Sequence, residues 1–302
     1  MKIGVMGSGA VGSFFGSFLT EANHEVTYIA RGKHLAEMRK NGLSIVRGEN
    51  KVIIHDTFSE KMEDLADCEL LLFCVKSGDT KETAWKLKQL LPESTYIMSL
   101  QNGVSNEETL VEVFGEARVL TAAVYVQASV ESPGIVKQSG RYRLVIGSLS
   151  DRGEEISEKV SALLNDAQIP AGCSSRIMLR KWKKYLFSII FNPLSAAADK
   201  TIGQILDDPY LKEIAWTVGR EAVEIAKLMG YPLNEEDIKT AFENAEFAKN
   251  HTTSMLQDIR NGKTTEADEL VGYLIDKAEE YGRSVDTIRT VYLLLKSREI
   301  IF

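Results

Sequence analysis

The sequence predicts a chain of two domains, a parallel α/β domain followed by an all-helical domain. In the first half, short apolar runs alternate with helix-like segments, which is typical of strand–helix–strand units and a parallel sheet. After about residue 165 the strand-like runs largely disappear and helical periodicity takes over. A length of 302 residues is also natural for two domains. Pro170 and Gly172 mark the change, and we expect domains at 1–168 and 169–302.

Each strand of the first domain is predicted from a local run of residues. The run Leu70–Val75, with the sequence LLLFCV, is apolar throughout, as expected of a strand that is buried on both faces. Lys2–Met6 is a strand followed by a helix at Ala10–Glu21. Further strands are expected at His24–Ile29, Thr95–Leu100 and Val119–Val126, with a hairpin that pairs Gly134–Val136 with Tyr142–Ile146.

The helices of the second domain are predicted from apolar residues that recur at helical spacing. They cover Met178–Phe191, Tyr210–Met229, Glu235–Asn250 and Thr265–Tyr281. Pro193 has no N–H group to donate, so we expect it to kink or interrupt the first of these helices.

Composition excludes several classes of function. The formal net charge of -7 disfavours nucleic acid or an anionic membrane as the main partner. No apolar run approaches the roughly 20 residues that cross a bilayer. The cysteines Cys68, Cys74 and Cys173 form no CxxC pair, which indicates reduced core thiols and neither a zinc ribbon nor a redox dithiol. We therefore expect a cytoplasmic protein with a small-molecule partner and no metal, for which a homodimer is possible.

A glycine-rich turn lies between the first strand and the first helix. Gly7-Ser8-Gly9-Ala10-Val11-Gly12 matches the pattern G-x-G-x-x-G. In this context Gly7 would permit a tight turn, Gly9 would admit a pyrophosphate close to the backbone, and Gly12 would let helix and strand pack closely. The alternative is a turn that only reverses the chain. The strand–turn–helix context favours a Rossmann-type dinucleotide-binding domain.

The end of the second strand predicts which dinucleotide is bound. An Asp or Glu about 20 residues beyond the turn would bind the ribose 2′-hydroxyl of NAD. This chain instead has Ile29-Ala30-Arg31-Gly32-Lys33. Arg31 suits the geometry of a 2′-phosphate, and Lys33 would add positive charge. A solvated surface arginine is the alternative, and NADP(H) is the cofactor that we expect.

Blocks of sequence along nearly the whole chain resemble those of one known family. In the first domain they are the opening KIGVMGSGAVG, Arg31, Val75-Lys76 and Gln101-Asn102-Gly103. In the second they are Trp182-Lys183-Lys184, Asn192-Pro193-Leu194, Ser254-Met255-Leu256-Gln257-Asp258 and Thr265-Glu266-Ala267-Asp268. This set is similar to that of the ketopantoate reductases. The resemblance implies reduction of 2-dehydropantoate to pantoate with NADPH, a step toward pantothenate and coenzyme A.

The resemblance also implies roles for individual residues, at a site that we expect between the domains. Lys184 is the expected general acid, and Glu266 would orient it or bind the substrate hydroxyl. The cofactor would contact the glycine turn, Arg31, Lys76 and Asn102. The 2-oxo acid would contact Asn102, Lys184, Ser188, Asn192, Ser254 and Glu266, with Ser254 at its carboxylate.

The residues themselves support these roles but leave alternatives open. Lys184, Ser188 and Asn192 are spaced by four, so they share one face of a helix. Lys184 could equally belong to a solvated basic face with Arg180, Lys181 and Lys183. Thr265 and Asp268 resemble a capping box. That box would put Glu266 in a first helical turn, where an acid is also favoured by the helix dipole.

One position departs from the family pattern. Ketopantoate reductases usually carry Asn four residues after the catalytic lysine, and this chain has Ser188. A reductase of a different 2-oxo acid is therefore one alternative. A nucleotide-binding redox sensor without turnover is another, although mere binding requires neither Lys184 nor Glu266.

Overall fold

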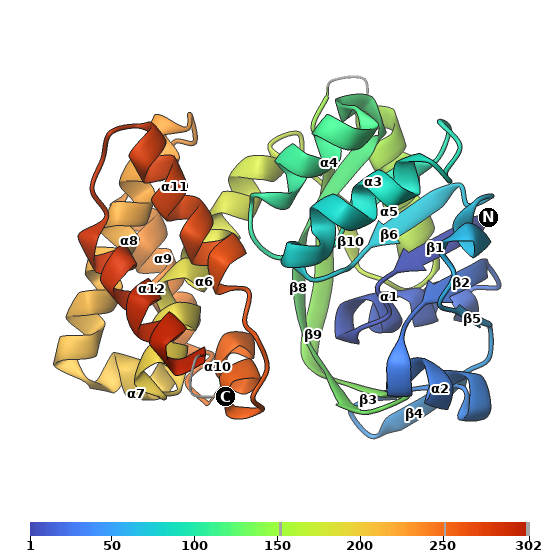
Figure 1. The fold of residues 1–302 in the computed structure, drawn as a ribbon, viewed down its shortest axis with the longest axis horizontal. Helices are drawn as coiled ribbons and strands as arrows, with labels where there is room; N and C mark the ends of the chain where they lie inside the picture. Colours follow the sequence, from blue (N-terminus) through green and yellow to red (C-terminus); the bar gives the residue numbers. More distant parts are fainter. Residues whose placement is uncertain (151–152, 251, 300–302) are drawn as a thin grey trace. The chain divides into compact units, whose positions relative to one another are not determined.

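The computed structural model describes residues 1–150, 153–250 and 252–299, which form two compact units (Figure 1). One unit comprises 1–102 and 106–177, and the other comprises Gly103–Ser105 and the chain from Met178 onward. Within the described residues, no helix is both long enough and apolar enough to cross a membrane.

The first unit is built on one sheet with the strand order β4-β3-β9-β8-β7-β6-β1-β2-β5, and β10 lies beside β9. The strands are β1 (Lys2–Met6), β2 (Glu25–Ile29), β3 (Leu43–Arg47), β4 (Asn50–Ile54), β5 (Thr57–Ser59), β6 (Leu70–Phe73), β7 (Tyr96–Ser99), β8 (Val119–Ser132), β9 (Ile135–Ser148) and β10 (Ala171–Cys173). Neighbours from β5 through β2, β1, β6 and β7 to β8 are all parallel. The chain leaves β1 toward β2 and returns on its other side at β6, which makes β1 a topological switch point.

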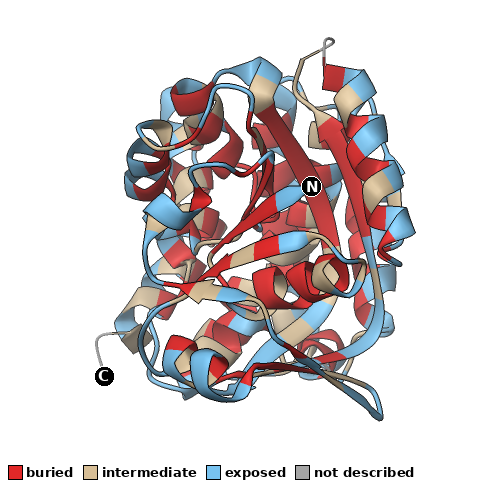
Figure 2. Cartoon of the chain, turned by 90° about the vertical axis from the view of Figure 1, so that its right-hand side faces the viewer, coloured by how far each residue is buried: buried red, intermediate tan, exposed pale blue. Residues whose placement is uncertain are grey.

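Helices cover both faces of this sheet. They are α1 (Ala10–Glu21), α2 (Gly32–Asn41), α3 (Thr80–Lys88), α4 (Asn106–Phe114) and α5 (Glu154–Asp166). Along β6, Leu70 and Leu72 join the apolar cluster that contains α1 residues, whereas Leu71 and Phe73 join the cluster that contains α3 and α4 residues. The prediction of a strand buried on both faces is confirmed, and Figure 2 shows the buried strands inside the unit.

The expected hairpin is wrong in its pairing. Gly134 lies in the turn that joins β8 to β9, and Val136 and Tyr142–Ile146 belong to the single strand β9. The chain reverses at Pro133-Gly134, where Gly134 adopts φ 75. β9 therefore pairs antiparallel with β8, for example Val145 with Ala123. Gly140, with φ 73, interrupts the regular spacing within the strand, which is why the sequence resembles two short strands.

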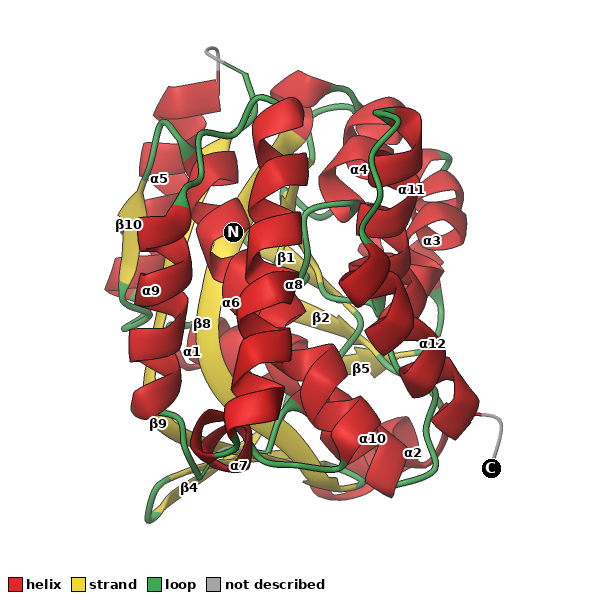
Figure 3. Ribbon diagram, turned by 90° about the vertical axis from the view of Figure 1, so that its left-hand side faces the viewer, coloured by secondary structure: helices red, strands yellow, loops and turns green. Residues whose placement is uncertain are grey.

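The second unit consists of helices around one apolar core (Figure 3). They are α6 (Ile177–Ala198), α7 (Ile202–Asp207), α8 (Pro209–Leu228), α9 (Glu235–Glu246), α10 (Ser254–Arg260), the π-helical turn η5 (Asp268–Gly272), α11 (Tyr273–Glu280) and α12 (Asp286–Glu299). The helix expected at Thr265–Tyr281 is thus divided between η5 and α11. Pro193 does not interrupt α6, which continues to Ala198, so the loss of one backbone donor is tolerated there.

The boundary between the units falls at Ile177 and not at residue 168. β10 pairs with β9, and the Ser174 amide donates to the Ile146 carbonyl at 2.9 Å. Ile177 itself packs on Ala123 and Val145. These contacts attach residues 169–177 to the sheet. They also leave Cys173 exposed, so this thiol is not in the core as expected.

We predict that this attachment is sensitive to one added methyl group. A Cβ at Gly147 would lie 2.4 Å from the Ser174 carbonyl oxygen and 2.7 Å from Ile177 Cβ. Overpacking of this kind costs about 1–3 kcal/mol, so Gly147→Ala should lower the free energy of unfolding by that amount in urea denaturation. Gly172→Ala is the control, because a Cβ there meets nothing within 4 Å. Equal unfolding midpoints for the two variants would contradict the prediction.

Candidate active site

The carboxyl ends of four parallel strands lie side by side. The register pairs Met6 with Ile29, Met6 with Phe73, and Phe73 with Ser99. The loops that follow these strands carry the residues predicted to bind the cofactor, which are Gly7 to Gly12, Arg31, Lys76 and Asn102. Pairing of the strands therefore brings these residues to one edge of the sheet, where ligands bind in folds of this kind.

The glycine turn has the shape of a phosphate cradle. Gly7 adopts φ 97, and a Cβ there would lie 2.8 Å from the Val75 amide nitrogen. A Cβ at Gly12 would lie 2.4 Å from the Gly7 carbonyl oxygen, so helix and turn are in close contact. At Gly9, by contrast, a Cβ would meet nothing within 4 Å. The turn is thus tightly packed at Gly7 and Gly12. It is open at Gly9, the glycine that a pyrophosphate would approach.

The start of α1 offers donors for an anion. Gly9 precedes the helix and makes no side-chain cap, so the first amides, beginning with Ala10 and Val11, have no capping side chain. The Ser8 side chain is 3% exposed, and its hydroxyl finds no hydrogen-bond partner in the described part of the chain. These groups and the helix dipole fit the pyrophosphate of a dinucleotide.

Arg31 lies at the surface. It precedes α2 with extended backbone, and its side chain is 89% exposed. The guanidinium contacts the Asp79 carboxylate at 3.2 Å. An exposed ion pair of this kind contributes little free energy, so the guanidinium can exchange this partner for a phosphate. Arg31 is thus exposed and held only by a weak ion pair, and its role as a 2′-phosphate ligand stays a prediction.

Lys76 and Asn102 are exposed in the loops after β6 and β7. In the same loops and the helices that follow them lie buried polar side chains. Among them, Thr80 and Asn106 were not singled out by the sequence, whereas Gln101 belongs to the block Gln101-Asn102-Gly103. Asn106 is the first residue of α4 and lies four positions after Asn102. That spacing at the start of a helix is the only local signal that could have drawn attention to Asn106.

In the second unit, α6 presents the predicted lysine. Lys184, Ser188 and Asn192 are all half-buried, whereas the helix residues between them are mostly buried. Burial, and to a lesser extent the positive charge of Lys181, lowers the pKa of Lys184 to about 7. Lys181 is itself only 3% exposed, so the alternative of a fully solvated basic face does not hold for it.

Hydrogen bonds fix the segments of Ser254 and Glu266 to α6. The Tyr185 hydroxyl donates to the Leu270 carbonyl, and the Leu270 amide donates to the Glu266 carbonyl at 3.0 Å. At the other end of α6, Thr253 Oγ1 donates to Ser195 Oγ at 3.2 Å, next to Ser254 at the start of α10. α6 is therefore the common support of these parts of the site.

The expected capping box of Thr265 and Asp268 is wrong. Thr265 Oγ1 accepts from the Ala267 amide at 3.1 Å, and the Asp268 carboxylate does not reach back to Thr265. Asp268 instead accepts from the Tyr292 hydroxyl at 2.6 Å and from Lys296 Nζ at 3.2 Å. Glu266 still lies half-buried at the start of this helical segment, two residues before a π-helical turn, a feature that often marks functional sites.

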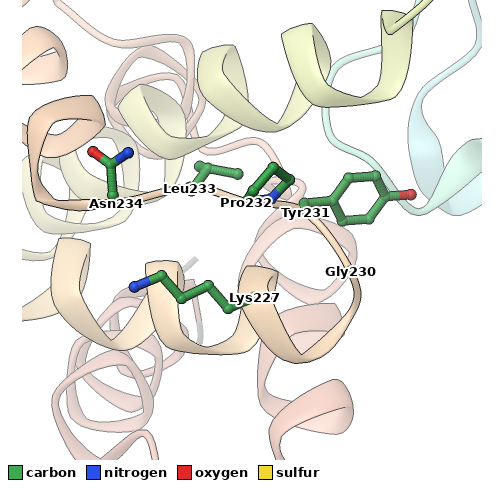
Figure 4. A pocket seen from close by; sticks show the side chains of 6 residues that line it. All are labelled: Lys227, Gly230, Tyr231, Pro232, Leu233 and Asn234. Carbon is green, nitrogen blue, oxygen red and sulfur yellow. The ribbon is translucent and has the colours of Figure 1, made fainter.

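A separate pocket of about 430 Å³ lies at the end of α8 (Figure 4). Lys227, Gly230, Tyr231, Pro232, Leu233 and Asn234 line it, and none of the predicted site residues is among them. The Asn234 side chain already accepts from the Glu236 amide at 2.9 Å to cap α9. The Tyr231 ring packs against Trp182 with centroids 5.1 Å apart. These roles are structural, so we do not assign the chemistry to this pocket.

Known proteins resemble this chain over nearly its whole length. The 2-dehydropantoate 2-reductase of Pyrococcus abyssi is 30% identical over 98% of this chain and 95% of its own length. The crystal structure of a PanE/ApbA family ketopantoate reductase from Ralstonia eutropha JMP134 superposes with a TM-score of 0.93 at 30% identity, covering 100% of this chain and 99% of that one. The fold is also shared with a D-mandelate dehydrogenase solved with NADH and anilino(oxo)acetate, with a TM-score of 0.94 at 22% identity and coverage of 100% and 99%.

Family models match both parts of the chain. The model described as ketopantoate reductase PanE/ApbA matches residues 3–151, and the model of the C-terminal part of the same family matches residues 176–299. The two matches fall on the sheet unit and the helical unit respectively. The chain therefore belongs to the ketopantoate reductase PanE/ApbA family.

Proposed function

We propose that this protein is an oxidoreductase that reduces 2-dehydropantoate to pantoate with NADPH, in the route to pantothenate and coenzyme A. Membership of the family and the names of its relatives support the reaction. The structural observation that carries the proposal is the place of Lys184, which is half-buried on α6 close to the buried Lys181. Burial, and to a lesser extent the charge of Lys181, lowers the pKa of Lys184 to about 7. A group with this pKa can give up a proton near neutral pH, as a general acid must.

In the proposed mechanism Lys184 acts on the carbonyl oxygen at C2 of the 2-oxo acid. NADPH, when bound, supplies the hydride that adds to C2. The electron pair of the C=O π bond then resides on the oxygen as an alkoxide, which takes a proton from the Lys184 ammonium. Before that transfer, the ammonium stabilises the developing negative charge. Lys184 is left as a neutral amine and regains its proton from solvent.

The remaining predicted residues hold the two ligands. Ser254 binds the substrate carboxylate, and Glu266 orients Lys184 or accepts a hydrogen bond from the product hydroxyl. Asn102, Ser188 and Asn192 hydrogen-bond polar groups of the substrate. On the cofactor side, the turn Gly7-Ser8-Gly9-Ala10-Val11-Gly12 binds the pyrophosphate, Arg31 the 2′-phosphate, and Lys76 and Asn102 the nicotinamide end. The open Gly9, the unpartnered Ser8 hydroxyl and the exposed Arg31 support this assignment.

A second candidate is reduction of a different 2-oxo acid by the same residues. Ser188 favours it, because a serine leaves more room than the asparagine usual in the family. The experiment that decides is oxidation of NADPH, followed by its absorbance, with a panel of 2-oxo acids. Fastest turnover with 2-dehydropantoate supports the proposal, and turnover only with another acid replaces it. No turnover with any acid, combined with tight NADPH binding, would favour a redox sensor.

The same proposal includes a cellular compartment and an oligomeric state. The cytoplasm is supported by three cysteines that are all free. A homodimer is the proposed assembly on the general frequency of such symmetry alone. Light scattering on the purified protein measures its mass directly, and a mass of one chain excludes the dimer.

The first prediction concerns the choice of cofactor. Arg31→Ala should weaken NADPH binding by roughly ten- to a hundred-fold, because a lost charged hydrogen bond to phosphate costs on the order of 1.5–3 kcal/mol. NADH binding should change little, since NADH has no 2′-phosphate. Titrations of both cofactors by fluorescence measure the effect. Equal affinity of the unmodified protein for NADPH and NADH would contradict it.

The second prediction concerns the proton donor. Lys184→Ala should lower kcat by roughly 10²–10⁴-fold, the usual contribution of general acid catalysis, with NADPH affinity little changed. Lys183→Ala is the matched control on α6, because Lys183 is exposed and pairs with Asp237 at 2.8 Å. Near-normal turnover of Lys184→Ala would remove Lys184 from the mechanism.

The acid form of Lys184 also predicts a pH dependence. Its pKa is lowered to about 7, so the ammonium predominates below that pH and is lost as the pH rises through it. For reduction, kcat/KM for the 2-oxo acid should be level at lower pH and should fall about tenfold per pH unit above about 7. A profile that stays flat to pH 9 would argue against this donor.

A further prediction concerns Ser188. A water molecule can occupy the space left by the family's asparagine and relay its hydrogen bond. Ser188→Asn should therefore change kcat/KM for 2-dehydropantoate by less than about tenfold, or 1.4 kcal/mol. A much larger gain, together with loss of activity on another 2-oxo acid, would show that Ser188 selects a different substrate.

A further inference from the structure

We propose that Asn106 is a positioning residue of the reaction, which fixes the main chain at Asn102 and is itself held by Thr80. The inference rests on the proposed function, because that function gives Asn102 its contact with cofactor and substrate. Asn106 touches neither ligand in this proposal. It acts through the backbone of the loop that follows β7.

A chain of hydrogen bonds joins the loops after β6 and β7. Asn106 Nδ2 donates to the Asn102 carbonyl at 2.9 Å and to Ser77 Oγ at 3.1 Å. The Thr80 hydroxyl donates to Asn106 Oδ1 at 2.8 Å. Gln101 Nε2 in turn donates to Thr80 Oγ1 at 2.7 Å and to the Val75 carbonyl at 3.0 Å. The amide of Asn106 thus uses its acceptor and both of its N–H groups.

Two backbone carbonyls fix the direction of every bond in this chain. A carbonyl oxygen can only accept, so the NH₂ group of Asn106 must face Asn102 and its Oδ1 must face Thr80. For the same reason the NH₂ group of Gln101 must face Val75. The single hydroxyl proton of Thr80 then has to point at Asn106. No other arrangement of these side chains satisfies all the contacts.

Burial makes the arrangement rigid. Asn106 and Thr80 are each 3% exposed and Gln101 is 5% exposed, so water cannot readily replace a lost partner. Asn102, in contrast, is exposed. The hydrogen bond from Asn106 to the Asn102 carbonyl fixes the backbone that carries this side chain and so limits where the side chain can lie. Through its bond to Ser77, Asn106 also holds the residue directly after Lys76.

The test uses three threonine variants of the full chain on α3. Thr80→Val keeps the shape of the side chain and removes the hydroxyl, whereas Thr80→Ser keeps the hydroxyl. Thr83→Val is the matched control, because Thr83 is a buried threonine of the same helix outside the chain of hydrogen bonds. For each variant, kcat, the KM values for NADPH and the 2-oxo acid, and the melting temperature are measured.

Positioning predicts a loss in kcat and not only in stability. A displacement of about 1 Å in a reacting group can cost on the order of a hundred-fold, so Thr80→Val should lower kcat by about ten- to a hundred-fold. KM should change much less, and Thr80→Ser should restore most of the loss. If Thr80→Val lowers the melting temperature and leaves kcat no lower than Thr83→Val does, the proposal is overturned.

A second variant keeps the proposal testable if Thr80→Val does not fold. Asn106→Asp is the same size, but its ionised carboxylate would set an oxygen against the Asn102 carbonyl. A protonated carboxyl can donate to that carbonyl, so its kcat relative to the unmodified protein should rise as the pH falls. A constant ratio across pH would contradict the role of the donated hydrogen bond.

Failure of the proposed function and failure of the positioning role are seen in different measurements. The unmodified protein alone tests whether 2-dehydropantoate is the substrate. The ratio of each variant to the unmodified protein tests the positioning role, with whichever 2-oxo acid is turned over fastest. If no acid is turned over, the fluorescence spectrum of bound NADPH replaces kcat as the readout of position, and an unchanged spectrum in both Thr80→Val and Asn106→Asp overturns the inference.

Discussion

The register of the parallel strands is the constraint on which the cofactor side of this structure depends. β2, β1, β6 and β7 end level with one another, so their following loops all emerge at one edge. A shift of one residue in any pair would turn every side chain of that strand to the opposite face. On β6 such a shift would exchange side chains between two closely packed apolar clusters, and the resulting voids and overlaps oppose it. The core of the sheet thereby determines where the ligand-binding loops lie.

In the helical unit, the corresponding constraint is the desolvation of the Lys184 ammonium group. An ammonium group in a poorly hydrated place loses stability relative to the neutral amine, and a second buried lysine nearby adds to this effect. Such an arrangement is costly for folding. Lys181 lies one turn before Lys184 on α6, in a helix otherwise embedded in the core. This arrangement separates Lys184 from an ordinary surface lysine.

Local patterns predicted the elements whose signals lie within a few residues. β1 and α1 begin and end where the sequence places them, because a strand, a glycine turn and a helix are each marked by neighbouring residues. β3 was missed, since it is held by parallel pairing with β9, nearly a hundred residues further along the chain. The same limit applies to Thr80 and Asn106, which meet only after folding, and to Lys181, whose burial no local pattern reveals. Residue types could indicate the chemistry of the site, but not the supports beneath it.

Because Arg31 is exposed, its proposed part in cofactor preference is separate from the stability of the fold. These two properties are often coupled in enzymes. The Arg31 side chain contributes almost nothing to the core, and its one described ion pair is solvated. Substitutions at such positions usually alter stability by no more than about 0.5 kcal/mol. In the role proposed for Arg31, selection can therefore change which nucleotide pool drives the reaction without first compensating for a weakened fold. The proposed cofactor preference of this chain is then a trait that can drift or be redesigned independently of its scaffold.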